Sequence, residues 1–150
     1  ACLQRSNMEP SQLQLEITEG MLQEGPPAVA LLQELAQRGV RLALDDFGDG
    51  NSSLSALRDL PVTALKIDRS CVAGLTVNES VRSLVRAVIG MGAATGKIVI
   101  AEGVEQAEQL EFLEAAGCDL LQGFLFAPAL PAAEIPAFVA AYTEAPSMVA

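Results

Sequence analysis

The stretch Val40-Arg-Leu-Ala-Leu-Asp45, followed directly by Asp46, is a short apolar run that ends in two carboxylates. A run of this kind predicts a strand buried on both faces, as in a parallel sheet covered by helices. The preceding segment supports this prediction, because Gln12–Thr18 alternates apolar and polar residues as a strand does. Pro26 can begin a helix between the two strands, and Gly39 can end it.

The same alternation continues to the end of the chain. Apolar segments predict further strands, and apolar residues three or four positions apart between capping residues predict helices. The expected strands are Ala64–Asp68, Lys97–Ala101 and Leu120–Phe126, and the expected helices are Asn51–Leu60, a long helix from Asn78 to Gly96, Gln106–Ala116 and Pro131–Thr143. This order predicts an α/β fold with a parallel sheet and right-handed crossovers.

Two architectures fit this order, a doubly wound sheet and a (β/α)8 TIM-like barrel. No GxGxxG motif follows a strand, which weakens the dinucleotide-binding form of the doubly wound sheet. Polar or acidic residues follow every predicted strand, as in barrel enzymes, whose sites lie at the carboxyl ends of the strands. A complete barrel takes about 250 residues. We therefore expect the 150 residues to form a partial barrel, with about strands 4 to 8 and their helices.

The composition restricts the class of function. Hydrophobic residues make up 51% of the chain, enough for a sizeable core, and the net charge of −10 disfavours DNA binding through a basic face. Divalent cations held by carboxylates can still join an acidic protein to a phosphate. Histidine is absent, which excludes the usual zinc sites and every His-dependent triad.

The three cysteines and the absence of a signal peptide or long apolar run predict a cytoplasmic location with reduced thiols, although the parent protein can be membrane-anchored elsewhere. The chain lacks an initiator Met and begins within a polar segment. We therefore expect a fragment of a longer protein.

Acidic residues occur in pairs at or just after three of the predicted strands. The pairs are Glu16 and Glu19, Asp45 and Asp46, and Glu102 and Glu105. Any one of them can be a solvated surface acid. At successive strand ends of a barrel, however, they would converge on one mouth and favour a divalent cation.

Lys66 is the only basic residue among the strand-end groups. It can stabilise the charge of a phosphate or orient a water, or it can form a structural ion pair with Asp68 or another acid. Gln122 can orient a water or support a ligand. These alternatives stay open at the level of the residues alone.

Five segments, in this order and at compatible spacings, resemble successive motifs of the EAL domain family. They are Leu15-Glu-Ile-Thr-Glu19, Leu44-Asp-Asp-Phe-Gly-Asp-Gly-Asn-Ser-Ser-Leu54, Leu65-Lys-Ile-Asp-Arg69, Ala101-Glu-Gly-Val-Glu105 and Gln122-Gly-Phe-Leu-Phe126. The resemblance covers nearly the whole chain. It implies a barrel that hydrolyses cyclic-di-GMP to linear pGpG with Mg²⁺ or Mn²⁺, in bacterial signalling and biofilm regulation.

The resemblance also implies roles for the acidic residues. Glu16 and Asp45 would bind one metal ion, and Asp45 would bridge to a second ion held also by Asp46 and Glu102. Glu102 would act as the general base, and Lys66 would hold the attacking water or a phosphate oxygen. The residues expected to support the site or contact substrate are Glu19, Asp68, Glu105, Gln122 and Phe126.

The chain departs from the family pattern in three ways. The Glu of the name motif and an Asn ligand belong to N-terminal strands that residues 1–150 lack, so we expect this partial domain to have little activity alone. Asp49 and Asn51 stand where a small residue and a Tyr are usual, and Cys71 stands where an aromatic residue is common.

Two other functions remain possible beside catalysis. One is a degenerate domain that binds cyclic-di-GMP as a receptor without cleaving it. The other is an interaction module, since in this family the loop after Asp46 links the site to a homodimer interface. A sensory or diguanylate cyclase domain can precede such a segment in the parent protein.

Overall fold

The computed structural model describes residues 2–22, 25–47 and 60–144 of the chain. Its centre is a parallel sheet with the strand order β1-β2-β3-β4-β5. The strands are β1 (Gln14–Ile17), β2 (Arg41–Phe47), β3 (Ala64–Ile67), β4 (Ile98–Glu102) and β5 (Leu120–Gln122). Each strand pairs with the next one in the sequence, whereas a doubly wound sheet reverses its order at a switch point. The topology therefore matches a section of a barrel.

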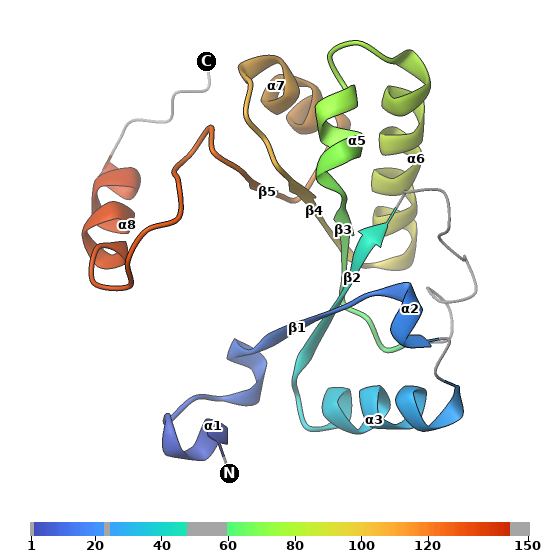
Figure 1. Cartoon of the computed structure of the whole chain (residues 1–150), viewed down its shortest axis with the longest axis vertical. Helices are drawn as coiled ribbons and strands as arrows, with labels where there is room; N and C mark the ends of the chain where they lie inside the picture. The colour runs from blue at the N-terminus through green and yellow to red at the C-terminus, as the bar shows by residue number, and fades with distance from the viewer. Residues whose placement is uncertain (1, 23–24, 48–59, 145–150) are drawn as a thin grey trace.

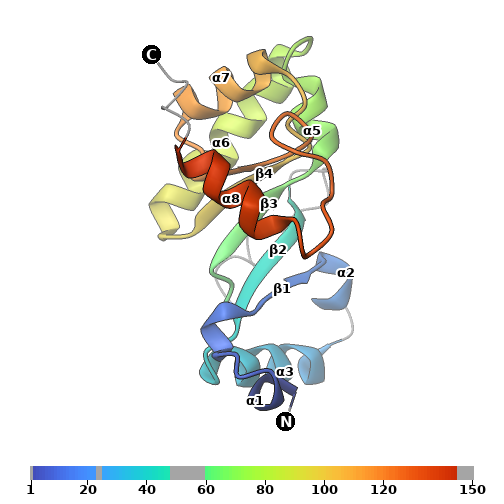
Figure 2. The same cartoon turned by 90° about the vertical axis from the view of Figure 1, so that its left-hand side faces the viewer.

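Helices connect the strands and cover one face of the sheet. The connecting helices are α2 (Glu19–Leu22), α3 (Pro26–Gln37), α5 (Arg69–Gly74), α6 (Glu79–Thr95) and α7 (Ala107–Ala116). The first helix, α1 (Cys2–Arg5), and the short 3-10 helix η1 (Pro10–Gln12) precede β1, and α8 (Ile135–Glu144) follows β5. Figures 1 and 2 show α5, α6 and α7 on one side of the sheet and α8 on the other.

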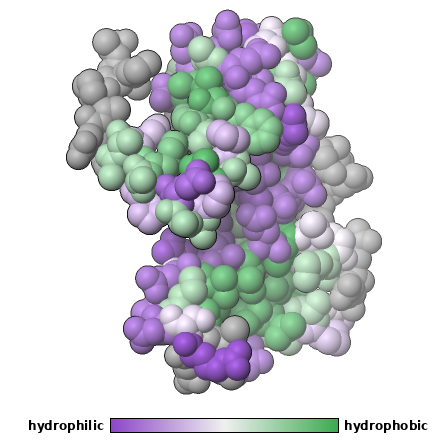
Figure 3. Space-filling model, turned by 60° about the vertical axis from the view of Figure 1, so that its left-hand side comes forward, coloured by the Kyte–Doolittle hydropathy of each residue, from purple (hydrophilic) through white to green (hydrophobic). Residues whose placement is uncertain are grey.

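The two faces of the sheet differ in what they bury. Side chains alternate between the faces of a strand, so Leu42 and Leu44 face the helices together with Leu65 and Val99 in the main core. The opposite face holds a separate small cluster of Ala43, Ala64 and Ile100. Figure 3 shows hydrophilic side chains across the middle of the molecule from the side of α8, with an apolar area below them.

Helix α6 shows how local sequence signals set the covering layer. The Asn78 side chain accepts a hydrogen bond from the Ser80 N–H at 2.9 Å and caps its N-terminus. Val85, Val88, Ile89 and Gly92 form its buried stripe. Gly96 ends the helix in the left-handed conformation, with φ of 65°. These features confirm the helix predicted from Asn78 to Gly96.

The expected strands and the long helices are confirmed, with differences at some of their ends and in the short helices; α8, for example, begins at Ile135 and not at Pro131. Strand β5 stops at Gln122 and does not reach Phe126, because the chain turns at residues 123–126, where the Phe126 N–H donates to the Gly123 carbonyl at 3.2 Å. The short helices α1, η1, α2 and α5 were not predicted, since three to six residues are too few to show a periodicity. The helix expected over 51–60 lies outside the described residues except at Leu60. No helix within the described ranges is long and apolar enough to cross a membrane.

Candidate functional site

The register of the sheet brings the polar strand ends to one edge and one face. Glu16 pairs with Ala43 on β2, and Asp45 lies two residues beyond Ala43, on the same face. Ala43 pairs in turn with Ala64 of β3, and Lys66 lies two residues beyond Ala64 on the same face. On β4, Glu102 is paired with Gln122 of β5. The carboxyl ends of all five strands therefore contribute to one polar region.

Lys66 lies at the centre of this region. Its Nζ atom is 2.7 Å from Glu16 Oε2, 3.1 Å from Asp45 Oδ1 and 2.6 Å from Glu102 Oε1. The Lys66 side chain is 4% exposed, and the side chains of Asp45 and Glu102 are about one quarter exposed. Three acids that lie up to 86 residues apart in the chain, the difference between 102 and 16, thus meet at one ammonium group.

These ion pairs determine the charge of Lys66. Burial alone would lower the pKa of the ammonium group, but the hydrogen bonds to Glu102, Glu16 and Asp45 outweigh it and raise the pKa above its usual value. Lys66 therefore stays positively charged. Three carboxylates surround one ammonium, which leaves an excess of two negative charges.

A β-bulge in β2 sets the direction of the two aspartates. Leu44 pairs with Leu65 and Phe47 with Ile67, so β2 has one more residue than β3 between these pairs. Asp46 takes the left-handed conformation, with φ of 56°, and its N–H donates to Asp45 Oδ1 at 3.1 Å. The bulge returns Phe47 to the buried core and keeps both aspartates out of it. Bulges re-aim side chains in this way next to active sites.

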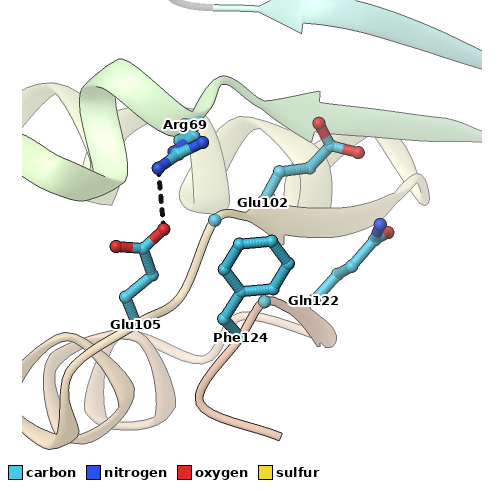
Figure 4. A pocket seen from close by; sticks show the side chains of 7 residues that line it. Arg69, Glu102, Glu105, Gln122 and Phe124 are labelled. Atoms are coloured by element: carbon cyan, nitrogen blue, oxygen red, sulfur yellow. Dashed lines mark hydrogen bonds and ion pairs between the residues drawn. The ribbon is translucent and has the colours of Figure 1, made fainter. Parts of the chain in front are cut away.

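A solvent-open pocket of about 170 Å³ is lined in part by Glu102, one of the three acids that contact Lys66. Figure 4 shows the Glu102 and Gln122 side chains reaching in one direction from neighbouring strand ends, with the Phe124 ring beside them. Arg69 and Glu105 form an ion pair of 2.8 Å on the side of the pocket opposite the Glu102 carboxylate. The lining residues are Arg69, Glu102, Gly103, Glu105, Gln122, Gly123 and Phe124.

The turn after β5 is fixed against the turn after β4. The Val104 N–H donates to the Gln122 carbonyl, and the Leu125 N–H donates to the Val104 carbonyl, both at 3.0 Å. A Cβ atom on Gly123 would lie 2.0 Å from the Val104 carbonyl oxygen. Only glycine allows this close approach, which places Gln122 beside Glu102.

The remaining expected site residues have different positions. Asp68 caps α5, accepting from the Ser70 N–H at 2.8 Å and from the Ser70 hydroxyl, and the hydrogen bond from this hydroxyl is the main reason why its pKa lies below the usual value. It is not among the Lys66 ion pairs. Phe126 packs against the main core and is not a lining residue of the pocket. Glu19 begins α2, but its side chain lies outside the described part, as does the loop at 48–59.

Three residues near the site received no role from the sequence or only a passing one. Arg69 lines the pocket, and it stands directly after Asp68 in one of the motif segments. Phe124 is 68% exposed and lines the same pocket, whereas the sequence drew attention to Phe126. Gln109 is a buried polar residue of α7. Its only sequence signal is the spacing Gln106-x-x-Gln109, a weak form of a helix capping box.

The donor set fits a divalent cation in its chemistry. Carboxylate oxygens are the ligands that Mg²⁺ and Mn²⁺ prefer, and an excess of two negative charges matches one such ion. In the described ranges, the carboxylates turn toward Lys66, and no three Asp, Glu or Cys side chains are arranged around a common metal position.

Comparison with known proteins gives consistent results. The family model of the EAL domain matches residues 1–129. The cyclic di-GMP phosphodiesterase NbdA of Pseudomonas aeruginosa is 40% identical over 141 residues, which cover 93% of this chain and 18% of NbdA. The chain thus spans less than a fifth of that relative's length.

Solved structures share the fold as well as the sequence. The PaMucR phosphodiesterase in complex with c-di-GMP superimposes with a TM-score of 0.83 at 39% identity, over 89% of this chain and 54% of that one. BlrP1 of Klebsiella pneumoniae, in a complex with manganese and cy-diGMP, gives a TM-score of 0.78 at 32% identity, over 84% of this chain and 32% of that one. Together with the five-stranded parallel sheet, these matches confirm a partial TIM-like barrel. The chain belongs to the EAL domain family.

Proposed function

We propose that the protein carrying this chain hydrolyses cyclic-di-GMP to linear pGpG with Mg²⁺ or Mn²⁺ bound at the carboxylates around Lys66. The observation that carries the proposal is the convergence of Glu16, Asp45 and Glu102 on one lysine at the carboxyl ends of the strands. Relatives named as cyclic di-GMP phosphodiesterases, and neighbours solved with c-di-GMP and manganese, support it.

The metal ions would be held by four carboxylates of this chain. Glu16 and Asp45 would hold one ion, and Asp45, Asp46 and Glu102 would hold a second. The bound ions would supply positive charge to the phosphodiester and make a bound water more acidic. The bulge in β2 supports the role of Asp46, since it places this residue next to Asp45 and outside the core.

The chemical step is the addition of one water across one P–O bond of the cyclic dinucleotide. The water oxygen forms the new bond to phosphorus, and the ribose 3′ oxygen leaves and takes up a proton, which gives linear pGpG. Glu102 would accept the proton of the attacking water as the general base. The positive charge of Lys66 would hold this water or a phosphate oxygen beside Glu102.

Other residues would support the substrate and the acids. Gln122 lies beside Glu102 through the strand register and can donate to a bound water or phosphate oxygen. Glu105 is fixed by its ion pair with Arg69. Glu19 and Asp68 would hold the neighbouring backbone, and Phe126 would support the site from the core side.

The names of relatives indicate further domains. MucR of the same bacterium is described as a bifunctional diguanylate cyclase and phosphodiesterase, and DosP of Escherichia coli as an oxygen sensor protein. We propose that this chain is likewise a partial domain of a signalling protein, coupled to a sensory or cyclase domain. Dimerisation through the loop after Asp46 would connect that domain to the site.

The test uses the intact protein with cyclic-di-GMP and either Mn²⁺ or Mg²⁺. Chromatography should detect linear pGpG that depends on the metal, and Glu102→Gln should lower the rate by about 100-fold or more. Glu111→Gln, an exposed acid of α7, is the matched control and should leave the rate unchanged.

Three outcomes would contradict the proposal. Binding of cyclic-di-GMP without any product would show a receptor, and absence of both binding and product would remove the nucleotide as a ligand. Metal-independent hydrolysis would contradict the role given to the carboxylates.

A further inference from the structure

Gln109 is a buried polar residue behind the proposed active site. It lies in the first turn of α7 and is only 3% exposed. Burial of an amide costs free energy unless the amide forms hydrogen bonds. Among the residues of the described ranges, the only other buried polar residue is Lys66 itself, at the centre of the site.

The carbonyl end of the Gln109 side chain holds the turn that follows Glu102. Its Oε1 atom accepts from the Glu105 N–H at 2.8 Å and from the Gln106 N–H at 3.0 Å. These two amides belong to the turn between β4 and α7, which begins directly after Glu102. This one side chain therefore holds two amides of the backbone on the carboxyl side of Glu102, beside the Val104 hydrogen bonds to the turn after β5.

The amide nitrogen of Gln109 connects this turn to a second element of the site. Nε2 donates to the Val72 carbonyl of α5 at 3.3 Å, across 37 positions of the sequence. Helix α5 begins directly after Asp68, two residues beyond Lys66. Gln109 thus joins the segment after Glu102 to the segment after Lys66.

A second connection lies on the solvent side of the same turn. Arg69, the first residue of α5, pairs with Glu105 at 2.8 Å. Figure 4 shows this pair at the rim of the pocket, on the opposite side from the Glu102 carboxylate. Since the Arg69 and Glu105 side chains are 65% and 40% exposed, water weakens this pair, and Gln109 is the stronger of the two connections.

We propose that Gln109 is a positioning residue, which fixes Glu102 toward Lys66 by joining the β4–α7 turn to α5. The expected effect of Gln109 on catalysis rests on the proposed function, the hydrolysis of cyclic-di-GMP. A role in capping α7 alone does not explain the donation to Val72, because a capping box needs only the acceptor at this position.

Three variants of the intact protein separate positioning from capping. Gln109→Leu removes all three hydrogen bonds. Gln109→Glu keeps both acceptor contacts and the cap, but replaces the donor to Val72 by a carboxylate oxygen. Gln106→Ala removes the other half of the capping box and leaves the three contacts of Gln109 in place.

The measurements are kcat, KM, the Mn²⁺ affinity by electron paramagnetic resonance, the melting temperature, and hydrogen exchange of the Glu105 and Gln106 amides. For Gln109→Leu we expect kcat and the Mn²⁺ affinity to fall about tenfold or more, with KM nearly unchanged and faster exchange at both amides. Gln109→Glu should lose kcat and should also melt below the wild-type temperature, because it places a buried carboxylate oxygen against the Val72 carbonyl. Gln106→Ala should lower the melting temperature and keep kcat within about twofold.

The proposal is overturned if Gln106→Ala lowers kcat as much as Gln109→Leu, or if Gln109→Glu retains full kcat. If the wild-type protein binds Mn²⁺ but does not cleave cyclic-di-GMP, the proposed function fails, and Mn²⁺ affinity and amide exchange still test Gln109. If the wild-type protein does not bind Mn²⁺, amide exchange alone decides, and unchanged exchange in Gln109→Leu overturns the proposal.

Discussion

The Nζ atom of Lys66 lies 2.6 Å from a carboxylate oxygen of Glu102, across the pairing of β3 and β4. Lys66 is buried and also contacts Glu16 and Asp45, so it is the common counter-ion of acids from three strands. This position gives Lys66 two roles. Its ammonium group holds mutually repelling carboxylates together, and it provides a positive charge where the proposed reaction develops negative charge.

Replacement of Lys66 by methionine should both destabilise the protein and stop the reaction. The three acids would lose their counter-ion, which should lower the free energy of unfolding by about 1–3 kcal/mol, less than for a fully buried ion pair because Glu16 is half exposed. Thermal unfolding with and without Mn²⁺ checks this, and Mn²⁺ should restore part of the lost stability. Arg38→Met, which removes an exposed ion pair with Glu34, is the control and should change little.

The contribution of Lys66 to stability should be constant through neutral and mildly alkaline pH. Its pKa is raised on folding, so the contribution is fully present below the unfolded value of about 10.4 and is lost as pH rises through the higher folded value. Urea unfolding of the wild type and Lys66→Met at about pH 7 and about pH 9 should therefore give the same difference. A difference that shrinks within this interval would contradict the ion-pair arrangement.

Asp68 should contribute to stability as a helix cap that is lost in acid. Its pKa is lowered on folding, chiefly by the Ser70 hydroxyl, so its contribution is present above the unfolded value of about 3.9 and is lost as pH falls through the folded value. Asp68→Ala should lower the free energy of unfolding by about 1 kcal/mol at neutral pH, measured by urea unfolding. Asp68→Asn is the control that retains a capping oxygen, and the advantage of Asp over Asn should decrease below about pH 4.

Two aromatic residues of the last motif segment should have separable roles. Phe124 is exposed in the pocket, so Phe124→Ala should raise KM for cyclic-di-GMP by roughly 5-fold to 100-fold through loss of stacking, with the melting temperature unchanged. Phe126 packs against the core, so Phe126→Ala should cost about 2 kcal/mol of stability. Steady-state kinetics and thermal unfolding of both variants check the assignment, which is wrong if the two effects are exchanged.

Two glycines of α6, two residues apart, should respond in opposite directions to alanine. A Cβ atom on Gly92 would lie 2.2 Å from Val99 Cγ2, so Gly92→Ala should separate α6 from β4 and cost about 1–3 kcal/mol. Gly90 has no neighbour within 4 Å of such an atom, so Gly90→Ala should stabilise the helix by about 0.5–1 kcal/mol. Chemical unfolding measures both changes, and equal effects would show that α6 does not pack as described.

The sequence was sufficient to predict the order of the strands and of the long helices, and to single out the acids that the structure gathers around Lys66. Apolar runs such as Leu42–Leu44 and the cap at Asn78 are local signals, and parallel strands bring their carboxyl ends to one edge. Which side chains on different strands form ion pairs depends on the register between the strands, and no short stretch of sequence specifies that register. The sequence therefore left open whether Lys66 pairs with Asp68 or with another acid, and the structure shows Glu16, Asp45 and Glu102.

Two further features depended on tertiary contacts. Gln109 looks like an ordinary polar residue of an amphipathic helix, and only the position of the Val72 carbonyl shows why it is buried. The early end of β5 follows from the close approach of Gly123 to Val104 in a neighbouring turn. Neither contact changes the local pattern of apolar residues from which the elements were predicted.

The extra residue in β2 determines which side chains face the core beyond it. Two residues separate Leu44 from Phe47, so without the bulge regular alternation would turn the Phe47 ring from the helices toward the barrel interior. Deletion of Asp46 would instead make Phe47 the second residue after Leu44, in regular register with Ile67 and still on the buried face. We therefore expect that a protein lacking Asp46 folds without the bulge and loses one carboxylate of the site, whereas Asp46→Asn, which keeps the left-handed conformation accessible, folds with the bulge in place.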